Sequence, residues 1–158
     1  MKKLICLGLS VIVAFSLLTG CKSSKESTNQ TTTTASTTTK KYDEIDTTIK
    51  SFFKAFEKGD FDKMKEFCTE NGKTQFNKYG YLGMNKAALN YLDNKYRESE
   101  KTGKVGVCFR LKVIECNDVQ KGIYKKGDTI GYCAIMKKED NNKWLIDSIT
   151  TDLSAIND

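Results

Sequence analysis

Apolar side chains between residues 45 and 56 recur with the spacing of an α-helix. Ile45, Ile49, Phe52, Phe53 and Phe56 are adjacent or separated by three or four positions, so all five share one face of a helix. The residues between them are mostly charged or small. The pattern therefore predicts an amphipathic helix whose apolar face packs against the rest of a folded domain.

Adjacent residues mark the end of this helix and the start of the next. Gly59 stands where a C-cap glycine belongs, and Asp60 can cap a second, shorter helix. That second helix is predicted to carry Phe61, Met64 and Phe67 on its buried face.

A third helix is predicted after residue 84. Asn71-Gly72 gives a turn that ends the second helix, and Gln75 to Gly83 is aromatic but holds two glycines, which leaves its structure open. Asn85 has the character of a helix N-cap. The apolar residues of the predicted helix are a staple of Met84 with Leu89 and a stripe of Ala88, Leu92 and Tyr96.

In the second half of the chain the apolar period changes to that of a strand. Val105 to Val113 alternates between apolar and other residues, which predicts a half-buried strand. A polar loop at Lys121 to Asp128 leads to a second strand at Thr129 to Lys137. A tight turn at Asp140 to Asn142 leads to a third strand at Lys143 to Thr150. Helices followed by antiparallel strands predict an α+β domain with the helices on one face of a sheet.

Residues 1–20 have the layout of a signal peptide. Met1-Lys2-Lys3 gives a positive start, and Leu4 to Leu18 is apolar but shorter than the roughly 20 residues that span a bilayer. The run closes in Leu18-Thr19-Gly20-Cys21, which resembles the lipobox of bacterial lipoproteins. The resemblance implies cleavage before Cys21, diacylglyceryl lipid on the Cys21 thiol, and anchoring on the extracytoplasmic face of the bacterial cell membrane.

Residues 21–41 are predicted to be the lipidated cysteine and a disordered tether. Lys22 to Lys41 is rich in threonine and serine and has no apolar side chain larger than Ala35. Such a composition cannot form a core. The folded domain is accordingly placed at 42–158, a length that suits one core and leaves no room for a second domain.

Two segments of this domain resemble parts of nuclear transport factor 2-like domains. FFKAFEKGDFDKMKEFC, Phe52 to Cys68, is similar to their opening pair of helices, and EDNNKWLIDSI, Glu139 to Ile149, is similar to their closing hairpin. The superfamily includes small lipid-anchored bacterial members. The resemblance implies a strongly curved antiparallel sheet that wraps around the helices as a cone with an apolar pocket.

Aromatic residues could line such a pocket and orient a small amphipathic ligand, although aromatic residues at helical spacing usually belong to a core. The candidates for ligand binding are Phe52, Phe56, Tyr91, Tyr96 and Trp144.

Charge and composition narrow the classes of function. Lys2 and Lys3 leave with the signal peptide, so 24 basic against 20 acidic residues give the mature chain a charge of +4. The excess is spread over scattered lysines, with Arg97 and Arg110 as the two arginines, which argues against nucleic-acid binding. The chain has no histidine and no phosphate-binding glycine loop. Histidine-dependent nucleophilic catalysis is therefore excluded, and no cofactor is expected.

Four cysteines remain in the mature domain: Cys68, Cys108, Cys116 and Cys133. None of them forms a C-x-x-C pair, so a metal site is not expected. Outside the membrane they can form up to two disulfides, and a cross-strand bond from Cys133 is feasible. Four buried, reduced thiols are the equal alternative.

Asp147 is the carboxylate that could abstract a proton, as in the ketosteroid isomerase-like enzymes of the superfamily. Asp147 lies on the same face of the strand as Leu145 and Ile149, and it would be buried if that face pointed inward. The opposite face, with Trp144 and Ile146, could equally well point inward. An exposed or turn-paired acid is the favoured interpretation, so no catalytic residue is assigned.

These observations predict a non-catalytic interaction or binding module, bound to membrane lipid through Cys21. A receptor for a small apolar or amphipathic ligand inside the cone is the alternative, and a carboxylate-based isomerase is the least favoured hypothesis. The expected partner is a protein or a small apolar ligand.

Overall fold

The computed structural model describes residues 32–78, 80–117 and 123–158, with side chains from residue 39 onward. The predicted signal peptide, the lipidation site Cys21 and the tether from Lys22 to Thr31 lie outside the described residues.

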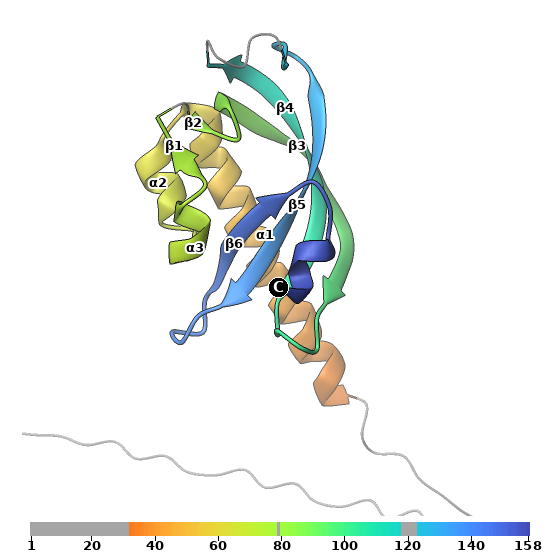
Figure 1. The fold of residues 1–158 in the computed structure, drawn as a ribbon. Helices are drawn as coiled ribbons and strands as arrows, with labels where there is room; N and C mark the ends of the chain where they lie inside the picture. The colour runs from red at the N-terminus through yellow and green to blue at the C-terminus, as the bar shows by residue number, and fades with distance from the viewer. Residues whose placement is uncertain (1–31, 79, 118–122) are drawn as a thin grey trace, which may run out of the picture. The chain divides into compact units, whose positions relative to one another are not determined.

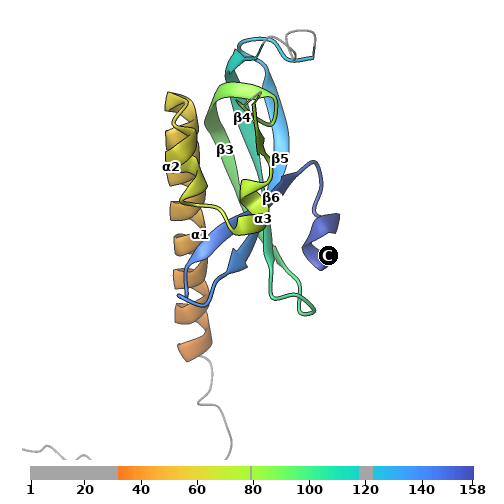
Figure 2. The same ribbon diagram turned by 60° about the vertical axis from the view of Figure 1, so that its left-hand side comes forward.

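Helices packed on a six-stranded antiparallel sheet form the described part of the chain, which confirms the predicted α+β class. The strands follow one another in chain order across the sheet, from β1 at one edge to β6 at the other. The helices are α1 (Thr32–Lys58), α2 (Phe61–Lys65) and α3 (Glu70–Lys73). The strands are β1 (Phe76–Asn77), β2 (Gly80–Tyr81), β3 (Met84–Glu98), β4 (Val105–Cys116), β5 (Thr129–Lys138) and β6 (Trp144–Thr150), and a 3-10 turn, η1 (Ser154–Asn157), follows. Figure 1 shows α1 crossing the sheet, and Figure 2 shows α1 and η1 on opposite faces of it.

The predicted junction between the first two helices is confirmed. Gly59 takes a φ of 73°, the left-handed conformation of a C-cap glycine. The Asp60 carboxylate accepts a hydrogen bond of 3.0 Å from the Lys63 amide and caps α2. The apolar face predicted for α1 lies in the core, with Ile45, Ile49, Phe52 and Phe56 fully buried.

Helix α1 begins at Thr32, inside the segment that the sequence predicts to be a disordered tether. Extending an existing helix avoids the cost of nucleating a new one, so residues with low helix propensity can be added to its end. Lys41 also makes specific contacts: its Nζ lies 2.6 Å from a Glu98 carboxylate oxygen and 5.3 Å from the centre of the Trp144 ring. The tether is predicted from its lack of apolar residues, and this criterion does not detect contacts made by a charged side chain such as Lys41.

The predicted third helix is wrong, because Met84–Glu98 forms the long strand β3, paired along its length with β4. The register between the two strands shifts between Leu89 and Tyr91 and again between Leu92 and Tyr96. The extra residues separate the inward-facing Leu89, Leu92 and Tyr96 by three and four positions, the spacing of a helix. Pairing with β4 therefore overrides a local pattern that β-bulges had made look helical.

The strands predicted in the second half of the chain are confirmed within a few residues. The turn between β5 and β6 closes through a 3.0 Å hydrogen bond from the Glu139 amide to the Lys143 carbonyl. Asn142 adopts a φ of 65°, which asparagine tolerates better than most residues. The segment whose structure the sequence leaves open, Gln75 to Gly83, contains the short strands β1 and β2, and the predicted turn at Asn71-Gly72 lies instead in the short helix α3.

One cluster of buried side chains joins the helices to the sheet. The Phe53 ring of α1 lies 4.8 Å from the Phe109 ring of β4, and the Phe52 ring lies 5.3 Å from the ring of Tyr81 in β2. Trp144 belongs to the same cluster and is 6 % exposed. The core therefore contains residues some ninety positions apart in sequence, as expected for helices packed on a sheet.

The outer edge of β6 is closed by groups from the α2–β1 region. The backbones of Phe67 and Thr69 pair with Ile146 at 2.9 and 3.0 Å. The Gln75 side-chain amide donates to the Ile149 carbonyl at 2.9 Å and accepts from the Ile149 amide at 2.8 Å, as a neighbouring strand would. Closing an edge in this way prevents pairing with other chains.

Candidate functional site

A groove of about 580 Å³ lies between residues 40–48 of α1 and the turn that joins β5 to β6. Three segments distant in sequence form it: α1, the end of the α2 region, and the start of β6. The residues that line it are Lys40, Asp43, Glu44, Thr47, Thr48, Glu66, Phe67, Asn142, Lys143, Trp144 and Leu145.

The floor of the groove is apolar and fixed in place. Phe67 and Leu145 are half-buried, and Trp144 is buried beneath Lys41. The Thr48 hydroxyl donates a 3.0 Å hydrogen bond to the Trp144 carbonyl, which ties α1 to the start of β6. The two walls are thus held together before any ligand arrives, and a preorganised site costs less to bind.

The rim of the groove carries both acidic and basic side chains. Asp43, Glu44 and Glu66 are exposed carboxylates, against the exposed ammonium groups of Lys40 and Lys143. The Glu66 carboxylate is paired with Lys63 at 2.5 Å. An apolar floor beside the adjacent carboxylates of Asp43 and Glu44 suits a partner that is apolar on one side and basic on the other.

A stack of two tyrosines fixes the wall of the groove that α1 provides. The Tyr42 and Tyr96 rings lie 4.0 Å apart and 7° from parallel. The Tyr42 hydroxyl donates to Glu98 at 2.5 Å, and the Tyr96 hydroxyl donates to Asp46 at 2.6 Å. The hydrogen bond to Glu98, with burial, raises the pKa of Tyr42 to about 12, and bonds from Lys41 and Tyr42 lower the pKa of Glu98. Through its stacking on Tyr42 and its hydrogen bond to Asp46, Tyr96 of β3 holds α1 against the sheet.

The five aromatic residues predicted to bind a ligand do not come together in one place. Phe52 and Phe56 are fully buried, and their rings lie 5.3 and 5.8 Å from Tyr81 as part of the packed core. Tyr91 is 53 % exposed and lines a different hollow. Of the five, Trp144 alone lines the groove.

The sequence did not indicate the other groove residues as candidates for binding. Phe67 is predicted on the buried face of a helix, and Asp43 and Glu44 precede the apolar pattern that predicts the first helix. Nothing in the spacing of Phe67, Asp43 or Leu145 indicates that their elements meet. Their juxtaposition depends on how α1 crosses the sheet.

The four cysteines among the described residues form one disulfide and leave two free thiols. Cys108 in β4 and Cys133 in β5 face each other in the ladder and are bonded, the cross-strand bond that the sequence allowed. Burial raises the pKa of the Cys68 thiol to about 12, and this thiol donates to the Met64 carbonyl at 3.6 Å. The Cys116 thiol donates to the Tyr124 carbonyl at 3.4 Å, and burial raises its pKa as well. A thiol with a raised pKa is a poor nucleophile at neutral pH.

Asp147 is buried, which corrects the favoured interpretation of it as an exposed acid. The register shifts in β6 at this position, because Ile135 faces Ser148 while the next residue, Met136, faces Ile146. Asp147 is thus the extra residue of a β-bulge, and simple alternation fails at that point. Its two carboxylate oxygens are engaged, one by the Thr69 hydroxyl at 2.8 Å and the other by Lys104 Nζ at 3.1 Å.

No group of three or more His, Cys, Asp or Glu side chains suited to hold a metal ion occurs within residues 39–78, 80–117 and 123–158. In the part of the chain that the structure describes, no helix is both long and apolar enough to cross a bilayer.

Comparison with known protein families and with characterised proteins finds no match for this chain.

Proposed function

We propose that the protein is a bacterial lipoprotein, anchored by lipid on Cys21, whose domain binds a partner without catalysis in the groove between α1 and β6. The order of charged start, short apolar run and Leu18-Thr19-Gly20-Cys21 supports the anchor. The groove carries the binding proposal, since it combines an apolar floor with the adjacent carboxylates of Asp43 and Glu44. The expected partner is a basic, amphipathic segment of another protein.

The domain is further proposed to be nuclear transport factor 2-like. Two features support this assignment: an aromatic helix that ends in Gly59-Asp60, and a closing hairpin that runs into Trp144. The packing of α1 on one face of an antiparallel sheet agrees with such a domain. The proposal places the binding site in the groove and not between α1 and the sheet, because the rings of Phe52, Phe56 and Tyr81 pack together there.

Replacing Cys21 with serine tests the anchor. The variant should accumulate as unprocessed precursor and should incorporate no radioactive palmitate, because serine lacks the thiol that accepts lipid. Cys6→Ser is the matched control, since it removes the other cysteine of the N-terminal segment and should mature normally. A Cys21→Ser protein that is labelled and cleaved as usual would refute the lipoprotein proposal.

Binding in the groove can be followed through Trp144, the single tryptophan of the chain. A ten-residue peptide of alternating lysine and leucine should change Trp144 emission on titration, whereas a peptide of alternating glutamate and leucine should not. Asp43→Asn combined with Glu44→Gln should weaken binding roughly five- to tenfold at low salt, as expected for two exposed ion pairs.

The matched control neutralises two exposed acids away from the groove, in Asp62→Asn combined with Glu70→Gln. These changes should leave the affinity unchanged. Equal losses in the two double variants, or equal binding of the acidic peptide, would show that the groove is not the site.

A further inference from the structure

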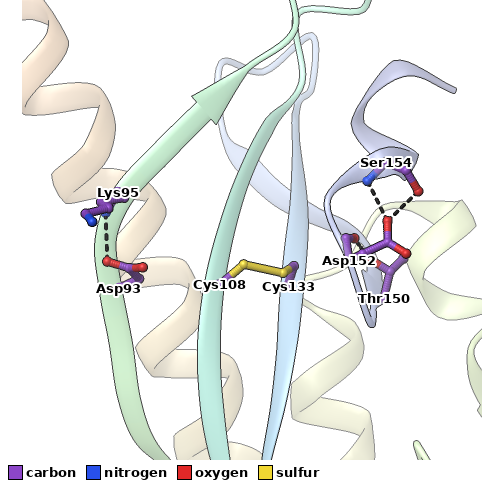
Figure 3. Close-up of a disulfide and its surroundings, with 7 residues drawn as sticks. All are labelled: Asp93, Lys95, Cys108, Cys133, Thr150, Asp152 and Ser154. Carbon is purple, nitrogen blue, oxygen red and sulfur yellow. Dashed lines mark hydrogen bonds between the residues drawn. A yellow bond between two sulfur atoms is a disulfide. The ribbon is translucent and has the colours of Figure 1, made fainter.

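The face of the sheet opposite α1 holds a second hollow, of about 310 Å³. It lies over β3, β4 and β5, where Tyr91 pairs with Arg110 and Arg110 pairs with Gly131. These three residues form one row across three strands. Asp93 and Thr151 complete the rim beside the Cys108–Cys133 disulfide. Figure 3 shows this face, with the disulfide between β4 and β5, Asp93 on β3, and α1 behind the strands.

Gly131 contributes open space to this hollow. It lies inside β5 without a positive φ, so the backbone does not require glycine, and glycine weakens a strand interior. A Cβ atom at Gly131 would meet no atom within 4 Å. A side chain at this position would therefore project into open space at the hollow, and glycine leaves that space unoccupied.

Gly106, on the same face of β4, provides the contrast. A Cβ atom there would lie 2.5 Å from the Leu153 side chain, so the chain's own C-terminal segment occupies the space that this glycine leaves. Two strand glycines thus create room on one face of the sheet. The protein fills the room at Gly106 and leaves the room at Gly131 open.

The opening of the hollow is lined by one basic side chain, Arg110, and one acidic side chain, Asp93. Arg110 is exposed, and none of the described residues accepts a hydrogen bond or forms an ion pair with its guanidinium. Asp93 uses one carboxylate oxygen to accept the Lys95 amide at 3.2 Å. Tyr91, at 53 % exposure, is one of the most exposed large apolar side chains in the described part of the chain. A guanidinium binds a carboxylate through two parallel hydrogen bonds, and a carboxylate binds an ammonium group. An exposed aromatic ring provides a surface on which another ring can stack.

We propose that this hollow is a binding site for a free amino acid with an aromatic side chain. The ligand's carboxylate pairs with Arg110 and its ammonium group with Asp93, while its ring lies against Tyr91 and in the space above Gly131. The disulfide holds β4 and β5 in register beneath the site. This site is independent of the groove and of any protein partner bound there.

Calorimetric titration of the full lipidated protein in detergent micelles, corrected with empty micelles, tests the ligand class. The probes are L-phenylalanine, 3-phenylpropionate, which lacks the ammonium, and phenethylamine, which lacks the carboxylate. Phenylalanine should bind at least about tenfold more tightly than either analogue, because each lacks one charge-assisted contact. Absence of phenylalanine binding, or equal binding of an analogue, would overturn the proposal.

Variants test the location. Arg110→Lys should weaken phenylalanine binding about tenfold or more, since lysine keeps the positive charge but cannot form two parallel hydrogen bonds with a carboxylate. Arg97→Lys, at the other arginine of the chain, should have no effect. Gly131→Val should abolish binding by filling the hollow, in a conformation that valine favours in strands. Unchanged Trp144 emission and unfolding midpoints would show that these variants remain folded. Normal binding by Arg110→Lys or Gly131→Val in folded protein would contradict the assigned site.

Discussion

Replacing Asp147 with alanine should lower the free energy of unfolding by about 3–5 kcal/mol, the usual cost of removing one member of a buried ion pair. The Asp147 side chain is 7 % exposed and its Lys104 partner is 17 % exposed, so the lysine would be left with little solvent to compensate it. The Thr69 hydroxyl would lose its acceptor as well. Urea unfolding followed by Trp144 fluorescence measures the loss.

Two further variants show whether the ion pair is the cause. Asp62→Ala breaks a pair in which the acid is 96 % exposed, and it should cost no more than about 1 kcal/mol. Adding Lys104→Met to Asp147→Ala should recover part of the stability, because no buried charge is then left alone. A cost below about 1 kcal/mol for Asp147→Ala would mean that solvent reaches this site.

Replacing Phe56 with alanine should also cost about 3–5 kcal/mol, the range for truncating a buried phenylalanine. The ring is fully buried and lies 5.8 Å from Tyr81, 6.2 Å from Phe61 and 6.4 Å from Phe53. These rings cannot close the space without leaving their own contacts. Native Trp144 should emit at short wavelength and resist quenching by iodide, and the same signal reports the shifted unfolding transition.

Glu57→Ala is the matched control, since it changes an exposed neighbour on the same helix. It should alter stability by less than about 0.5 kcal/mol. A loss below about 1 kcal/mol for Phe56→Ala would show that the ring borders an empty space, and would favour a ligand receptor inside the domain.

The sequence by itself determined the elements whose signals are local. The buried face of α1 follows from the spacing of Ile45 to Phe56, and its end follows from Gly59 and Asp60, because caps and helical periodicity depend on neighbours within a few residues. Strands β4, β5 and β6 follow from alternation in the same way. The cross-strand disulfide at Cys133 remained one of two alternatives, since the redox state and partner of a cysteine depend on distant residues.

The tertiary structure alone decided β3, the orientation of Asp147 and both candidate sites. In β3 and β6, β-bulges insert residues into the ladder, so the inward face no longer recurs at every second position. A bulge is stabilised by the partner strand and its neighbours, and the residues themselves carry no marker of it. The groove joins Asp43, Phe67 and Leu145, and the opposite hollow joins Tyr91, Arg110 and Gly131. Each set comes from three separate elements, and their meeting is fixed by strand register and by the path of α1 across the sheet, which are properties of the packed whole.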